Sequence, residues 1–179
     1  MRKQKGFSLI ELLIVVAIIL IIAAIAIPNL LRARIAANES SAVSSIRTIN
    51  TAEVTYQSAY PTWGYASTLT MLGPGGVGST CPAGGPTQAN GCLIDSVLAN
   101  AIVGGPPKSG YEFGLAATQG AGGLYLTYTV ATAPVAFNQT GVRDFCSNED
   151  AVVQFAPGAA GAAPVGQGGC VSPAFQPLQ

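Results

Sequence analysis

Four cysteines are the residues of this chain best suited to form covalent cross-links. They are Cys81, Cys92, Cys146 and Cys170. An even number of cysteines in an exported, loop-rich segment favours disulfide bonds. Of the three possible pairings, we favour the one that closes two local loops rich in Gly and Pro. It joins Cys81 to Cys92 and Cys146 to Cys170. Closing each loop would stabilise the fold by about 3 kcal/mol in the chain-entropy model.

Two other uses of these cysteines are open: free buried thiols and a zinc site. Zinc is disfavoured because the spacing contains no CxxC pair. The chain also has no His, which is both the commonest metal ligand and the commonest general base. Asp144 and the run 147–150 bring together several oxygen atoms that could bind Ca²⁺. They lack the spacing of an EF-hand, so we interpret this segment as a solvated turn. We therefore expect no enzymatic activity, no metal and no cofactor.

Glu11 is a carboxylate inside an apolar segment. Sixteen consecutive apolar residues occupy 12–27, and with 7–11 the segment reaches 21 residues before Pro28. A helix of that length spans about 30 Å, the thickness of a bilayer core. A carboxylate there costs about 2.5 to 3.5 kcal/mol on insertion scales, so it should have a partner or a purpose. A cleaved secretory signal ending near 24–26 and a plain membrane anchor both leave Glu11 unexplained.

The residues around Glu11 form a recognisable pattern. A short basic leader ends in Gly6, and Phe7-Ser8-Leu9-Ile10-Glu11 runs directly into an apolar helix with Pro28 at its end. This pattern resembles the N-terminus of type IV pilins and of the pseudopilins of type II secretion, over roughly residues 1–60. In that family a membrane peptidase cuts after the glycine and methylates the new N-terminus. The resemblance implies cleavage between Gly6 and Phe7, N-methylation of Phe7, and Glu11 as the carboxylate of filament assembly.

The amine that cleavage would create explains why a carboxylate is tolerated here. Phe7 would then present a charge in apolar surroundings, and an unpaired buried charge is costly. Glu11 is its natural counterion, either within one subunit or in a neighbour, where the bridge would also fix the register between subunits. The alternative is that Glu11 extends to the lipid headgroups.

The resemblance also implies partners and a location. The expected partners are other copies of the chain in a helical homopolymer, the prepilin peptidase, the inner-membrane assembly platform, and the membrane before assembly. Three cations before the apolar span and two after it favour a cytoplasmic N-terminus. The chain would cross the inner membrane once and later form a periplasmic or extracellular filament. Eight basic and eight acidic residues give no net charge, which argues against nucleic acid as a main partner.

Two kinds of function fit this pattern. The first is a structural subunit of a type IV pilus, or of the shorter pseudopilus of type II secretion. The second is an anchored adhesion or binding module of low abundance, as minor pilins are. Both use the same N-terminal helix, so the motif does not separate them.

The N-terminal helix should extend well past the apolar span. From 28 to 60 the pattern becomes amphipathic, which predicts one helix from Phe7 to about Tyr60. Its apolar stripe consists of Ala42, Ile46, Ile49, Tyr56 and Tyr60. The other faces carry Arg32, Arg34, Asn38, Glu39, Ser40, Arg47 and Asn50. Pro28 lacks an N–H group, so we expect a kink or local unwinding between 24 and 28.

The remaining residues, 61–179, should form a globular head with long loops. Only 9% of the chain is charged, and Gly and Pro number 22 and 12. Helical turns are expected at 66–72 and 93–101, and strands at 111–117, 124–132, 142–146 and 152–155. The last 23 residues are predicted to be irregular. The predicted fold is α+β: leader 1–6, transmembrane helix 7–27, amphipathic helix 28–60, and a small antiparallel sheet packed on it, as in the pilin fold.

Overall fold

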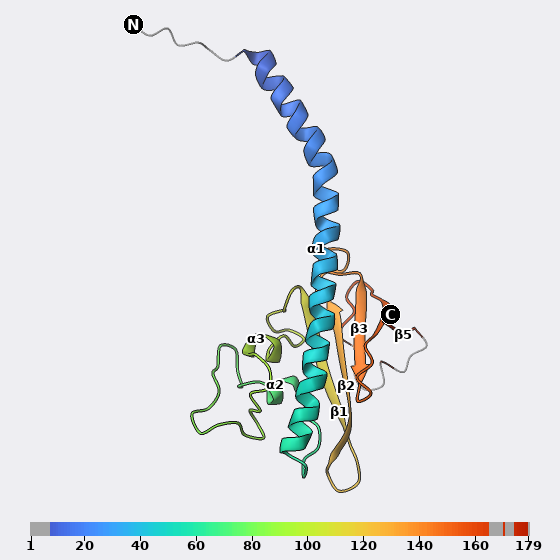
Figure 1. The fold of residues 1–179 in the computed structure, drawn as a ribbon. Coiled ribbons are helices and arrows are strands. Elements are labelled where there is room, and N and C mark those ends of the chain that lie inside the picture. Colours follow the sequence, from blue (N-terminus) through green and yellow to red (C-terminus); the bar gives the residue numbers. More distant parts are fainter. Residues whose placement is uncertain (1–7, 165–169, 171–173, 179) are drawn as a thin grey trace. The chain divides into compact units, whose positions relative to one another are not determined.

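The structure, a computed structural model, describes residues 8–164, 170 and 174–178. Its helices are α1 (Leu9–Ala59), α2 (Leu69–Leu72) and α3 (Ser96–Ala99) (Figure 1). Its strands are β1 (Tyr111–Gln119), β2 (Tyr125–Pro134), β3 (Arg143–Asn148), β4 (Gln154–Pro157) and β5 (Gln176–Pro177). The chain divides into two compact units, an N-terminal unit (Met1–Arg34) and a head (Ile35–Gln179). The predicted α+β class is confirmed.

The described part of the N-terminal unit is the first half of α1. This segment is long and apolar enough to cross a membrane. Its large apolar side chains are exposed, from 42% for Leu31 to 79% for Leu9. The helix continues through Pro28 without a break, so local unwinding at 24–28 was a wrong expectation. Pro28 still leaves the carbonyl of Ala24 without its helical donor, and a kink there stays a prediction.

The sheet of the head is an antiparallel meander in which the strands lie side by side in chain order. β1 and β2 form the longest pair, with Tyr111 opposite Pro134 and Leu115 opposite Val130. All four predicted strands are present, with ends shifted by a few residues. β5 was not expected: the last residues were predicted to be irregular, yet Gln154 and Phe155 of β4 pair with Pro177 and Gln176.

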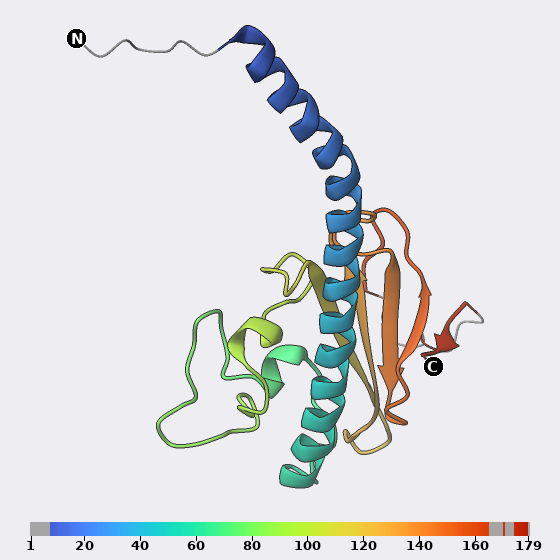
Figure 2. The same cartoon turned by 45° about the horizontal axis from the view of Figure 1, so that its top comes forward.

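The core of the head lies between α1 and one face of the sheet. The part of α1 that belongs to the head lies across β1, β2 and β3 (Figures 1 and 2). Its buried stripe is Ala42, Ile46, Ile49 and Tyr56, as predicted, while Tyr60 is only half-buried. The sheet contributes Tyr111, Phe113, Tyr128, Val130 and Phe145. Side-chain alternation along β2 puts Leu126 on the same face as Tyr128 and Val130, yet Leu126 is 53% exposed, because it lies next to the loop that closes the β1–β2 hairpin.

The loops between α1 and β1 fold by local contacts. Gly64 has φ +88° and lies against β2, where a Cβ would overlap the carbonyl oxygen of Tyr125. The two short helices are shorter than the predicted ranges, at four residues each. α3 begins where the side chain of Asp95 accepts a hydrogen bond from the Leu98 N–H at 2.7 Å. These contacts hold a long, Gly-rich loop to the head without adding strands to the sheet.

Candidate functional site

Glu11 caps the helix to which it belongs. The backbone N–H of Ser8 donates to Glu11 Oε2 at 3.0 Å, while the Ser8 carbonyl accepts from the N–H groups of Glu11 and Leu12. A Ser followed three residues later by Glu is the sequence of a capping box, and this contact is one of its two hydrogen bonds. We did not recognise the S-x-x-E signature in the sequence, although it was visible there. In the single chain, Glu11 therefore stabilises the start of α1.

The two residues of the expected cleavage site, Gly6 and Phe7, lie outside the described residues. The pairing of the Phe7 amine with Glu11 therefore stays a prediction. What the structure does show is the surface beside Glu11, an apolar helix whose large side chains are exposed over 9–27. An exposed apolar surface of this extent must be covered by lipid or by protein.

An ion pair between Glu39, which is buried, and Arg143, whose side chain is 41% exposed, joins α1 to β3. Arg143 donates to Glu39 Oε2 from Nη2 at 2.6 Å and from Nε at 2.9 Å, and the Val142 N–H donates to the other oxygen at 3.1 Å. Glu39 is 4% exposed. The guanidinium also lies 5.6 Å from the ring centres of Phe145 and Phe155. The prediction that Glu39 faces solvent was wrong, because its partner lies 104 residues away on another element.

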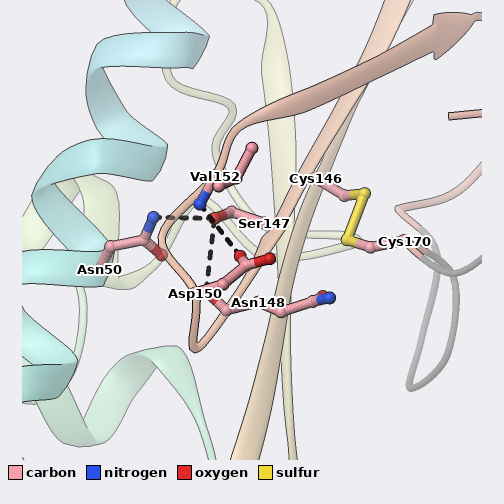
Figure 3. The surroundings of a disulfide bond; sticks show 7 residues. All are labelled: Asn50, Cys146, Ser147, Asn148, Asp150, Val152 and Cys170. Atoms are coloured by element: carbon pink, nitrogen blue, oxygen red, sulfur yellow. Dashed lines mark hydrogen bonds between the residues drawn. A yellow bond between two sulfur atoms is a disulfide. The ribbon is translucent and has the colours of Figure 1, made fainter. Parts of the chain in front are cut away.

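Asn50 makes a second polar contact between α1 and the sheet. Its Nδ2 donates to Ser147 Oγ at 2.9 Å, and its Oδ1 accepts from the Tyr128 hydroxyl at 3.1 Å. Figure 3 shows Asn50 reaching from α1 toward Ser147 on β3. Asn50 was also predicted to lie on an outer face, and it is buried. Its hydrogen bonds offset the free-energy cost of burying the amide.

Glu53 is the most unusual titratable group of the head. Its side chain is fully buried, and Oε2 accepts from the Ala66 N–H at 2.8 Å. Oε1 has no hydrogen-bond partner in the described part of the chain. Burial raises the pKa of Glu53 to about 8, and the Ala66 bond opposes that rise. The burial of Glu53 could not be predicted from the sequence, because Glu53 is one of several polar residues of an amphipathic helix.

All four cysteines are joined in disulfide bonds. The structure pairs Cys81 with Cys92 and Cys146 with Cys170, with Cα separations of 5.9 and 5.7 Å. This is the pairing that local loop closure favoured. Figure 3 shows the second bridge on the side of β3 away from α1. Cys146 and Cys170 form a small apolar cluster with Ala131 and Phe175. The bridge attaches the C-terminal segment to β3.

No three His, Cys, Asp or Glu side chains lie close enough together to hold a metal ion within the described residues. The acidic run after β3 is the turn that leads to β4. In it the Asp150 carboxylate accepts from the Val152 N–H at 3.0 Å, and Ala151 has φ 58° (Figure 3). Glu149 and Asp150 are exposed at this turn. The structure thus places these carboxylates on the surface of the head.

The chain is similar to pilins in its N-terminal segment. The family model described as the prokaryotic N-terminal methylation motif matches residues 1–27. The type IV wide pilus major component PilA4 of Thermus thermophilus is 68% identical over 40 residues, which are 22% of this chain and 30% of that protein. The type IV major pilin protein PilA of Myxococcus xanthus is 45% identical over 54 residues, 30% of this chain and 24% of that protein.

A protein of the secretion branch is similar as well. The type II secretion system core protein G of Vibrio cholerae is 42% identical over 65 residues, 35% of this chain and 44% of that protein. The chain therefore spans less than half the length of each of these relatives. No solved structure matches significantly. Together the motif and the relatives support the type IV pilin and pseudopilin family for this chain.

Proposed function

We propose that the chain is the structural subunit of a type IV pilus or a pilus-like filament. In this proposal the leader is removed between Gly6 and Phe7, Phe7 is N-methylated, and the subunit polymerises through α1. The observation that carries the proposal is the exposed apolar half of α1, which begins with a methylation motif and carries a carboxylate at its start. Polymerisation would cover this surface with the same segment of other copies.

The proposal extends to partners and location. A prepilin peptidase would process the chain, and an inner-membrane assembly platform would add it to the filament. Before assembly the chain would cross the inner membrane once with its N-terminus in the cytoplasm. The head would then be displayed in the periplasm or outside the cell, where the two disulfides are stable. The role is structural, as it is for the pilus components among the relatives.

The second candidate is a pseudopilin of a type II secretion system, and the match to core protein G favours it. A minor pilin that serves as an anchored adhesion module is a third variant with the same helix. These roles differ in the amount of the subunit. We expect the chain to be the main component of filaments sheared from cells that express it. Recovery in trace amounts only would favour the minor-pilin role.

N-terminal mass analysis of the filament or membrane fraction tests the processing step. The expected mature chain begins at methylated Phe7 and keeps the whole of α1, because the cut removes only the basic leader. The leader is six residues long. A mature start after Ala26 would instead mean that the apolar segment is a secretory signal, and the pilin proposal would fail.

A further inference from the structure

Charged side chains are so few in this chain that each can be followed to its partner. The chain has eight cations, of which Arg2, Lys3 and Lys5 belong to the leader. In the head, Lys108 pairs with Asp95 at 2.9 Å and Arg143 pairs with Glu39. Arg32, Arg34 and Arg47 are exposed and form no ion pair within the described residues. Three cations of the processed chain therefore lack an anion.

The eight anions can be sorted in the same way. Glu39 and Asp95 form ion pairs, and Glu11 caps α1. Glu53 is buried and Asp144 is half-buried. Glu112 is half-buried on β1. The remaining two, Glu149 and Asp150, are exposed neighbours in the β3–β4 turn and form no ion pair with any described residue. This turn is thus the head's most accessible pair of negative charges.

Arg32 and Arg34 follow the apolar span directly, which gives them anionic partners in the membrane. Cations just beyond a transmembrane segment lie at the level of the lipid headgroups and contact their phosphates. On entry into a filament the subunit leaves those phosphates behind. A guanidinium enclosed by neighbouring subunits without an anion would then oppose assembly. An anion on a neighbouring copy would remove this cost.

We propose that the β3–β4 turn of one copy supplies this anion, with the Glu149 and Asp150 carboxylates binding the Arg32 and Arg34 guanidiniums of a second copy. The inference rests on the proposed function, because it needs a filament. Arg47 is excluded as the partner because it lies beside the turn of its own chain, where it lines one hollow with Ala151. Since the two charged patches are different surfaces, the contact is heterologous and repeats from copy to copy along a filament.

Charge reversal tests the contact in cells that assemble the full chain. We expect Glu149→Lys with Asp150→Lys, and separately Arg32→Glu with Arg34→Glu, to lower filament yield by about tenfold, because each places like charges opposite one another. Combining all four substitutions restores opposite charges and should recover most of the yield. Glu112→Lys is the matched control, since it makes the same kind of charge change away from the turn, and it should leave the yield unchanged.

Each outcome has a defined meaning. Wild-type yield from either reversal, with both disulfides formed, would overturn the contact. So would a combined variant that assembles no better than the single reversals while its head stays protease-resistant. If the unmodified chain itself is absent from filaments, the proposed function fails, and that result is seen before any variant is made.

A cross-linking experiment gives a positive signal for the same contact. Arg32→Lys with Arg34→Lys keeps the charges and adds amines that carbodiimide couples to carboxylates. In filaments mixed from isotopically light and heavy subunits, we expect mass spectrometry to find light–heavy peptides that join position 32 or 34 to Glu149 or Asp150. Cross-links from these positions to other carboxylates only would contradict the proposal.

Discussion

At the scale of single residues, Glu53 makes the head sensitive to pH. Burial raises its pKa from 4.5 to about 8, so the folded chain keeps a proton that the unfolded chain has lost between these values. The free energy of unfolding should therefore fall as pH rises from 4.5 to about 8 and change little above that. Asp144, whose pKa burial raises from 3.8 to about 6, adds a loss of the same sign in the lower part of this window.

Glu53→Gln should remove most of this pH dependence, because a neutral amide replaces the carboxyl that ionises. The measurement is the urea midpoint of the full chain in detergent at pH 5, 7 and 9, with disulfides intact. Asp144→Asn serves as the control that removes only the loss below about pH 6. If the wild type and the Glu53→Gln variant lose stability in parallel over pH 5, 7 and 9, Glu53 is not the group responsible.

The buried polar residues also show what the sequence of one helix cannot reveal. Helical periodicity identified the apolar stripe of α1, because that stripe follows from the 3.6-residue repeat alone. It could not identify Glu39 and Asn50 as buried, because the groups that make their burial possible are Arg143 and Ser147 on β3. Which polar residue acquires a distant partner is decided by the packing of the whole head.

At the scale of elements, the strands β1 to β4 and the cysteine pairing could be predicted because local sequence patterns determine them. The strand β5 could not be predicted in this way. Alternation of side chains located β1 to β4, and loop closure gave the cysteine pairing that the structure has. β5 has only two residues, Gln176 and Pro177, and no alternation to detect. It exists because the Cys146–Cys170 bridge and the Leu178 N–H bond to the Val153 carbonyl hold the segment beside β4.

This dependence of β5 on the second disulfide is testable. Cys146→Ser with Cys170→Ser should lower the free energy of unfolding by about 2 to 5 kcal/mol, because the unfolded chain gains conformational entropy without the bridge. It should also free the C-terminal segment, which loses its covalent link to β3. Limited proteolysis should then cut beyond Phe155 while α1 stays intact. The matched control is Cys81→Ser with Cys92→Ser, which opens the other loop and should leave the C-terminal segment protected. Equal resistance of the wild type and the first variant would contradict this account.

At the scale of the whole molecule, the two compact units have separate tasks. The described part of the N-terminal unit is an exposed apolar helix surface with one carboxylate. The head is stabilised by its own core, two disulfides and the Glu39–Arg143 pair. The family model covers only residues 1–27, within the first unit. A substitution in the helix surface should therefore alter assembly without unfolding the head.

Glu11 is the residue at which that separation is best tested, because the structure gives it a second task. It caps α1 through Ser8 in the single chain, and the proposed function also asks its charge to pair with the Phe7 amine during assembly. Glu11→Ala removes both the cap and the charge. Glu11→Gln keeps a side-chain oxygen that can accept from Ser8, as Gln does in capping boxes, and removes only the charge.

If the charge is what assembly needs, both Glu11 variants should accumulate in the membrane with folded, disulfide-bonded heads and give few or no filaments. The measurement is the amount of chain in the sheared filament fraction relative to the membrane fraction, with Glu112→Gln as a control that removes a charge from the head. Filaments from Glu11→Gln at wild-type yield, with none from Glu11→Ala, would show that the cap matters and the charge does not. Wild-type yield from both would exclude Glu11 from assembly, because neither the cap nor the ion pair would then be required.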